Sequence, residues 1–557
     1  MRFNFLITLL FFFTTINAQW SNDPSENLQV SYSGIWSEAC SDGAGGAYVT
    51  WLSYDYSNSK VYLQHIDKLG YLSWEQPLLV GQVGNFQIGR THISPDKEGG
   101  VYVAFDQMTP IDTVDGHIVI WDSKGIIQRV GQNATLLWDS LGINVSTDTT
   151  QQHQIEIFSE NDGNAIVSWG ATITPTARFG YFAQKFDKSG QHQWNNKGVL
   201  IDTSGSSSQN KIVSDKKEGL IATYQNHKIP YQMLRRIDYT GEISWTDSIY
   251  TDYFWIFRNI QNDRKGSAIL VIDSDINWPI DQLQAIKIDS NGIFSWGEVG
   301  IILSEGERDF DTGGLMTINE KSEPTFIWSD IYDSTKTQFI QTLTVDGQKK
   351  WTGNIIIGTD SSNKEVFRVL ASNDLSNILL YKKNGDDNIF YAEKIDSSGN
   401  IEWSDIIITN DAGGEVSVIS DGNGGMVVIW LREYYEGIFA QQISKDGNLG
   451  DMVNSVRSKY LSKTPNVFEI NHNYPNPFNS STIIEFNIPR PGKITFNVYT
   501  VLGEMIYSKE TLFNFPGKNS IQWNSKTTNG KEVNSGIYYF EITFAGMRQT
   551  NKAVLIK

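Results

Sequence analysis

A short pattern recurs through most of the chain and constrains the fold more than any other feature. Each clean copy reads apolar residue, Asp, two residues, Gly, three residues, Trp. The clean copies are Ile66–Trp74, Phe186–Trp194, Ile237–Trp245, Ile288–Trp296 and Ile395–Trp403; Val130–Trp138 and Thr344–Trp351 are degenerate, and an eighth, Ile443–Gly450, lacks the tryptophan. Successive tryptophans lie about 55 residues apart on average, a period typical of solenoids, propellers and arrays.

A second element precedes each copy. It is a polar turn, often with glycine, that opens into a β-rich run ending in an aromatic residue, as at Asp42–Gly46 before Trp51. In this unit we expect strands at 47–51, 61–66, 72–74 and 77–80, because these runs are rich in β-branched and aromatic residues. Helical periodicity is absent. Three to four short strands in each of eight units predict an all-β chain with an eight-bladed β-propeller over residues 19–450.

One alternative is a string of independent β-sandwiches. Units near 52 residues are small for domains that must each bury a core of their own, which favours the propeller. Turn chemistry explains the pattern itself: Asp accepts hydrogen bonds from the backbone ahead of it, Gly supplies a positive φ, and Trp packs between neighbouring units.

The pattern resembles the tryptophan-docking motif of pyrroloquinoline-quinone-type propellers, which commonly have eight blades. In that family the Gly follows one residue later, so the resemblance concerns architecture and does not support the quinone cofactor. The pattern also resembles the Asp-box of sialidases, with different spacing on both sides of the Gly.

Charge and motif content narrow the function classes. The formal net charge is -18 and the sequence pI is about 4.9, so nucleic acid is a poor partner. The single cysteine, Cys40, allows neither an intramolecular disulfide nor a cysteine-based metal site. Gly-x-Ser-x-Gly, His-Glu-x-x-His and Walker motifs are absent from the sequence. We therefore predict no catalytic, cofactor-binding or metal-binding residues.

Two aromatic segments are candidates for a ligand surface. Tyr253 and Trp255 lie in the dense aromatic run 250–258, and Tyr434 and Tyr435 lie beside glutamates in 432–436. Aromatic faces next to carboxylates can stack on sugar rings at the mouth of a propeller. The competing interpretation is that both segments are packed blade strands.

The N-terminus predicts a secretory signal peptide at residues 1–18. Arg2 precedes the apolar run Phe5–Phe13, and Ala18 offers a cleavage point before Gln19. This run is too short to span a bilayer as a helix, and no later stretch is apolar for about 18 residues. We expect no membrane span once the signal peptide is removed.

The repeat stops near residue 450. Residues 451–468 are polar without a period and predict a linker. Residues 469–557 then alternate in strand fashion, as in Ile484, Phe486 and Ile488. About seven short strands in this length predict a small immunoglobulin-like β-sandwich. This segment has a formal charge of +3, from nine Lys/Arg and six Asp/Glu, so it contrasts with an acidic body.

Residues 469–557 resemble the C-terminal (Por-type, type A) sorting domain of cargo exported by the type IX secretion system. The resemblance rests on Pro475-Asn476-Pro477-Phe478, on Leu502-Gly503 after a strand, on Gly536 and Tyr538, and on a final apolar strand ending at Lys557. Thr500 stands where the family usually has Asp or Asn. The resemblance implies export across the outer membrane of a Bacteroidota-type bacterium, binding to the type IX machinery, and cargo that is anchored or released at the cell surface.

Taken together, these patterns predict a secreted or cell-surface protein whose propeller is a binding module, with a glycan or a protein as its ligand. The alternative is an extracellular glycan-active hydrolase with carboxylates at the propeller mouth.

Overall fold

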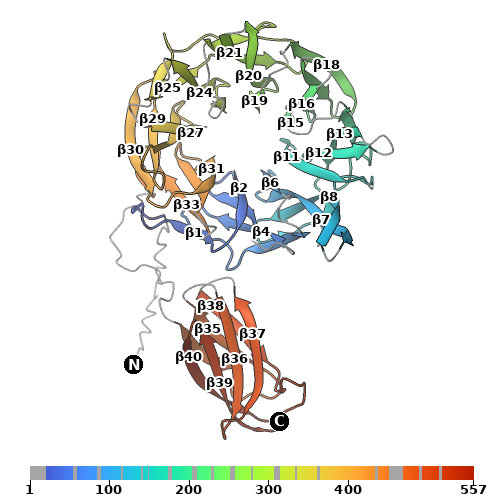
Figure 1. Cartoon of the computed structure of the whole chain (residues 1–557), viewed down its shortest axis with the longest axis vertical. Helices are drawn as coiled ribbons and strands as arrows, with labels where there is room; N and C mark the ends of the chain where they lie inside the picture. The colour runs from blue at the N-terminus through green and yellow to red at the C-terminus, as the bar shows by residue number, and fades with distance from the viewer. Residues whose placement is uncertain are drawn as a thin grey trace, which may run out of the picture. The chain divides into compact units, whose positions relative to one another are not determined.

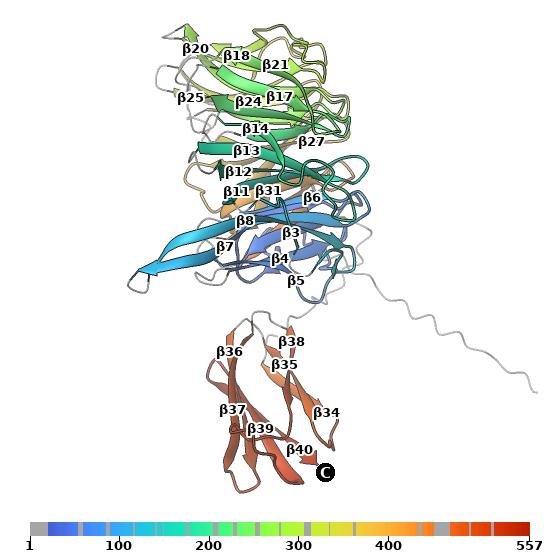
Figure 2. The same ribbon diagram turned by 90° about the vertical axis from the view of Figure 1, so that its right-hand side faces the viewer.

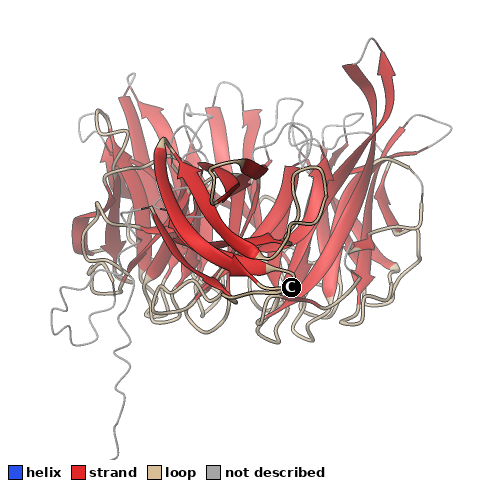
Figure 3. Cartoon of the chain, turned by 90° about the horizontal axis from the view of Figure 1, so that it is seen from below, coloured by secondary structure: helices blue, strands red, loops and turns tan. Residues whose placement is uncertain are grey.

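The computed structural model describes residues 20–53, 59–84, 90–114, 117–139, 142–148, 150–173, 178–203, 210–226, 231–250, 257–277, 280–305, 314–332, 335–359, 364–432, 437–450, 468–488, 492–513 and 517–557. The chain divides into two compact units, with Gly34–Asp451 in the first and Met452–Lys557 in the second. The described residues form strands and turns, without a helix (Figure 3).

Eight antiparallel sheets make up the described part of the first unit. Seven of them have four strands, as the repeat predicts, and the second has five, two of them long. In chain order the sheets are β2–β5 (Ile35–Ser41, Ala47–Leu52, Ser59–Ile66, Leu78–Gly84), β6–β10 (Thr91–Pro95, Val101–Val114, His117–Gly131, Thr135–Leu136, Ile143–Asn144), β11–β14 (Gln152–Ser159, Ala165–Ile173, Arg178–Phe186, Val199–Asp202), β15–β18 (Lys211–Ser214, Leu220–Asn226, Tyr231–Ile237, Ile243–Tyr250), β19–β22 (Phe257–Asn262, Ala268–Asn277, Ile280–Ile288, Ile301–Glu305), β23–β26 (Leu315–Ile318, Pro324–Tyr332, Thr335–Thr342, Ile355–Thr359), β27–β30 (Lys364–Ala371, Asn377–Lys383, Phe390–Ile395, Ile401–Thr409), and β31–β33 (Gly414–Ser420, Met426–Leu431, Ile438–Ile443) with β1 (Leu28–Ser31).

The sheets are arranged as the blades of a propeller, which confirms the predicted fold class (Figure 1). The first strand of each sheet is innermost: β2 lies against β6 on one side and β31 on the other, and the same neighbour relation continues round the ring. The β7–β8 hairpin is longer than its counterparts and extends beyond them (Figure 2). In the last sheet, β1 pairs with β33, so the start of the chain completes the final blade.

The repeated tryptophans join each blade to the next. Each indole Nε1 donates a hydrogen bond to a backbone oxygen in the Asp-x-x-Gly turn, or its equivalent, of the following blade. The pairs are Trp74–Gln132, Trp138–Lys188, Trp194–Tyr239, Trp245–Ser290, Trp296–Val345, Trp351–Ser397 and Trp403–Lys445.

Trp20 makes the eighth junction. Its Nε1 donates to the oxygen of Lys68 at 3.2 Å, and its ring is almost completely buried. The indole lies so close to Gly70 that a Cβ there would meet it at 2.7 Å, and Gly70 has a φ of +83°. The eighth copy of the repeat therefore has its tryptophan after all, supplied from the N-terminal side.

Aspartates build the turns as the spacing predicts. In the first repeat, Oδ1 of Asp67 accepts hydrogen bonds from the N–H groups of Leu69 and Tyr71, both at 2.9 Å. The expected strand at 72–74 is wrong: this segment follows the turn and makes a single bridge, between Ile66 and Leu72. Because Asp67 and the turn backbone satisfy one another, the local chain bends instead of extending.

In several blades the polar turn before the second strand contains a buried acid. Oδ1 of Asp96 accepts hydrogen bonds from the N–H groups of Glu98 (2.8 Å) and Gly100 (2.7 Å). Its other oxygen pairs with Arg129 on the third strand at 2.9 Å. The same acid–base pair recurs as Asp42–His65, Asp215–Arg236 and Asp263–Lys287. These carboxylates are saturated by structural contacts.

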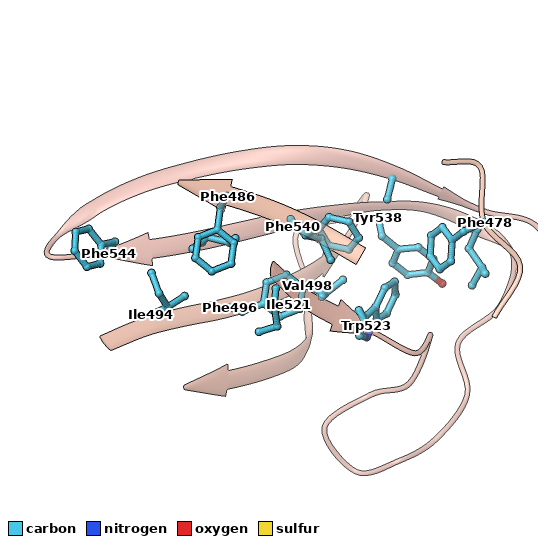
Figure 4. Packing of buried hydrophobic residues seen from close by; sticks show 14 of the residues in the cluster. Phe478, Phe486, Ile494, Phe496, Val498, Ile521, Trp523, Tyr538, Phe540 and Phe544 are labelled. Carbon is cyan, nitrogen blue, oxygen red and sulfur yellow. The ribbon is translucent and has the colours of Figure 1, made fainter. Parts of the chain in front are cut away.

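The second unit packs two sheets, β34–β35–β38 and β37–β36–β39–β40. Its strands are β34 (Glu469–Tyr474), β35 (Thr482–Ile488), β36 (Gly492–Thr500), β37 (Met505–Phe513), β38 (Gly517–Trp523), β39 (Gly536–Phe544) and β40 (Met547–Leu555). The alternating residues of β35 and β36, such as Phe486 and Phe496, are fully buried and meet Phe540 in one core (Figure 4). The predicted β-sandwich is confirmed.

Candidate functional site: the motif end of the C-terminal unit

The Pro-Asn-Pro-Phe segment lies along the end of β40. Oδ1 of Asn476 accepts a hydrogen bond from the N–H of Val554 (2.9 Å), and its amide donates to the oxygen of Lys552 (3.2 Å). The backbone of Phe478 continues the pairing, with a parallel bridge to Leu555. Pro475 and Pro477 are exposed, and the peptide bond before each is cis.

The Phe478 side chain anchors this segment in the core. It is 3% exposed, and its ring lies 5.9 Å from that of Trp523. Tyr538 meets the same indole edge-on at 5.3 Å, and its hydroxyl donates to the oxygen of Asn534 at 2.7 Å. The three aromatic rings lie together in Figure 4. The aromatic motif residues therefore serve as packing anchors for the exposed segment.

Leu502 and Gly503 form the turn between β36 and β37. The N–H of Gly503 donates to the oxygen of Thr500 (3.0 Å), and the Thr500 hydroxyl accepts from the N–H groups of Leu502 and Glu504 (both 3.3 Å). Thr500 thus performs the turn role that Asp or Asn has in the related family. Leu502 is held at the tip with 91% of its side chain exposed.

Gly536 and Lys557 complete the set. Gly536 opens β39 directly opposite Leu555. The backbone N–H of Lys557 donates to the Ser535 hydroxyl (2.9 Å), and its Nζ pairs with Glu532 at 2.7 Å. This ion pair is exposed, so its contribution to stability is small.

All nine motif residues lie at one end of the sandwich, which we call the motif end. Strand register places them there: Thr500 is opposite Tyr538, Gly536 is opposite Leu555, and Leu555 bridges Phe478. The sequence predicted the residues one by one. It did not predict that segments more than 70 residues apart would meet, because that depends on the order of strands in the two sheets.

Exposed apolar side chains gather at the same end. Among the described residues of the second unit, the exposed large apolar residues at this end are Tyr474, Ile483, Val501, Leu502, Met505, Ile537, Tyr539 and Ile556, whereas Met547 lies at the opposite end, paired with Phe544. Apolar side chains gathered on a protein surface are typical of interaction sites. In the sequence, the only indication of this surface was the presence of two apolar residues, 501 and 502, inside a turn.

A polar cavity of about 490 Å³ opens beside it. It is lined by Asn479, Ser480, Ser481, Asn524, Ser525, Lys526, Glu532 and Lys557. The motif end thus combines exposed apolar groups with hydroxyl, amide and charged groups. Across the residues that the structure describes, no cluster of His, Cys, Asp or Glu suits a metal ion.

The sequence also predicted a ligand surface on the propeller, formed by four aromatic residues. Tyr253, Trp255, Tyr434 and Tyr435 lie outside the described residues.

A model of the family described as "Secretion system C-terminal sorting domain" matches residues 472–557. These residues are a type IX sorting domain. The matched residues include the whole motif end, so the expected resemblance is confirmed. The sorting domain indicates secretion of the chain to the cell surface or beyond. No curated protein matches the chain. Within its described residues, no helix is long and apolar enough to cross a membrane.

Solved structures similar to the chain are β-rich. One is the polysaccharide lyase Uly1, at 10% identity and a TM-score of 0.43, covering 74% of this chain and 90% of that one. A eukaryotic initiation factor has 10% identity and a TM-score of 0.40, covering 77% and 89%. The Hadza microbial sialidase Hz136 has 9% identity and a TM-score of 0.31, covering 57% and 68%.

Proposed function

We propose that this chain is cargo of the type IX secretion system and that its propeller works outside the cell as a binding module. In this proposal residues 1–18 are a signal peptide, 19–450 an eight-bladed propeller, 451–468 a linker and 469–557 the sorting domain. The host is a Bacteroidota-type bacterium, and the ligand of the propeller is a glycan or a protein.

One observation supports the export route most strongly. The motif residues and the exposed apolar side chains of the sorting domain lie at the same end of the sandwich. Leu502 is the most exposed of them, and it lies on a hydrogen-bonded turn. An apolar side chain fixed in a rigid turn loses little conformational freedom on binding, so it is an efficient contact. The export machinery therefore recognises the motif end.

Replacing Leu502 tests this role. Leu502→Asp puts a charge where the partner buries an apolar group, and it weakens recognition roughly tenfold or more. We expect the variant to accumulate in the periplasm, measured by cell fractionation and surface labelling. Because Leu502 is exposed, the variant should melt as the original protein does.

Met547→Asp is the matched control. Met547 is also exposed, at 46%, but lies at the opposite end of the sandwich. This variant should reach the surface normally. If both variants are exported alike, recognition does not use the motif end.

The alternative function is a glycan-active hydrolase with carboxylates at the propeller mouth. Release of chromophore from aryl glycosides by the purified protein would favour it, and inactivity on a broad glycoside panel would leave the binding module.

A further inference from the structure

The innermost strands carry ionisable residues at one common level. Glu38 on β2, His92 on β6, Glu156 on β11 and Lys211 on β15 each pair with the residue just before the aromatic that marks the end of the repeat's second strand. They are therefore equivalent positions on four consecutive blades. The equivalent residues on the other four blades are Asn259, Leu315, Arg368 and Ser417.

These four residues form a chain of alternating charge across the blades. Nδ1 of His92 lies 3.0 Å from a carboxylate oxygen of Glu38. Lys211 pairs with Glu156, and the charge of Glu156 also acts on His92. All four side chains keep part of their surface exposed. All four stand on the innermost strands of the ring (Figure 1), and each of these strands contacts the next.

Asp106 supplies a buried acceptor beside this chain. It is 3% exposed, and His92 is close enough for its charge to act on the carboxyl group. Oδ2 accepts a hydrogen bond from the N–H of Gln154 at 3.3 Å. The backbone N–H of Ile155 also acts on this carboxyl group, whereas Oδ1 makes no hydrogen bond of ordinary geometry among the described residues. A buried acceptor left without a donor is unfavourable, so this carboxyl group favours a positive charge on its neighbour His92.

The charge pattern selects a class of ligand. Glu38 and Glu156 oppose an anion, Lys211 opposes a cation, and each charge is already balanced by a neighbour. Alternating donors and acceptors suit a ligand whose groups can both donate and accept, which is the property of hydroxyl groups. Because the pairs hold one another in place, little side-chain freedom is lost on binding, and hydrogen bonds to charged groups are strong.

We propose that Glu38, His92, Glu156 and Lys211 form a site on the innermost strands for an uncharged, hydroxyl-rich glycan. This site gives the binding module a ligand class, so it rests on the function proposed above for the propeller.

The test is isothermal titration of the full chain with four hexasaccharides: cellohexaose and mannohexaose (neutral), hexagalacturonate (anionic) and the glucosamine hexamer (cationic). We expect a neutral hexasaccharide to bind more tightly than either charged one. His92→Gln and Glu156→Gln should each weaken this binding about tenfold or more. Cleavage of a neutral hexasaccharide that is lost in His92→Gln would also support the site.

His65→Gln is the matched control, because His65 pairs with Asp42 at 2.9 Å in the turn beyond the far end of β2. This variant should bind as the original chain does, and circular dichroism should show that all three variants are folded. Binding that His92→Gln and Glu156→Gln leave unchanged would overturn the site but leave the binding module. Preference for a charged hexasaccharide would overturn the ligand class. Binding of none would overturn the glycan site and leave a protein as the ligand of the binding module.

Discussion

Asp106 is a buried carboxyl group whose pKa is shifted by its place in the propeller. Burial raises its pKa to about 7 from a usual value of 3.8, and the charge of His92 opposes the shift only partly. The pKa of His92 also lies above its usual range: burial lowers it, but the hydrogen bond and charge of Glu38, with Glu156 and Asp106, outweigh that.

Both shifts make stability fall as pH rises. A group whose folded pKa exceeds its unfolded pKa stabilises the fold while protonated and loses this contribution as pH climbs through the folded value. Asp106 therefore loses its stabilising contribution between about pH 4 and about pH 7.

Asp106→Asn should therefore flatten the pH profile. The original protein is expected to lose roughly 1–4 kcal/mol of unfolding free energy across this window that the variant keeps. Urea unfolding at a series of pH values measures it. Parallel profiles for the two proteins would mean that Asp106 is already ionised in the folded state at low pH.

The role of Trp20 could be predicted from the sequence only in part. It precedes Trp74 by 54 residues, close to the mean repeat of about 55, so periodicity alone could have found it. The rest of its motif is the eighth copy, Ile443–Gly450, at the other end of the propeller's sequence, where Ser444 stands in place of the Asp. Only ring closure brings the two parts together.

At the level of elements, the N-terminal segment closes the ring. β1 adds the fourth strand to the last sheet, and Trp20 docks on the first blade at Lys68. The oxygen of Ser21 also accepts a hydrogen bond from Gln441 (3.1 Å). A short stretch of chain thus links the first and last blades, so the ring depends on it.

Trp20→Ala should destabilise the propeller by roughly 3–5 kcal/mol, as expected for a buried aromatic residue. Guanidinium unfolding followed by tryptophan fluorescence measures this. Leu79→Ala, at an apolar side chain that is 46% exposed, is the control and should change stability by less than about 0.5 kcal/mol. An equally small effect at Trp20 would show that ring closure does not depend on its indole.

The innermost strands were the elements that the sequence reveals least. In the first blade, β3, β4 and β5 follow predicted runs, but β2 reads Ile-Trp-Ser-Glu-Ala-Cys-Ser without clear alternation. Its pairing with β3 shifts register between Ile35 and Glu38, which breaks the two-residue period. Since Glu38, His92, Glu156 and Lys211 stand on such strands, their common level could not be predicted.

At the scale of the whole molecule, the chain combines an acidic propeller with a mildly basic sorting domain. The sequence predicted both folds because the propeller repeats its turn chemistry eight times and the sandwich alternates cleanly at Ile484–Ile488 and Ile494–Val498. It also predicted the sorting motif residues. Their convergence on one end, and the exposed apolar surface around them, depend on tertiary structure.

The central claim is that residues 469–557 direct the propeller out of the cell. The most direct measurement compares cells that produce the full chain with cells that produce the chain lacking 469–557, by fractionation and surface protease accessibility. We expect the full chain at the surface or in the medium, and the shortened chain as a folded propeller retained in the periplasm. Normal surface delivery of the shortened chain would contradict it.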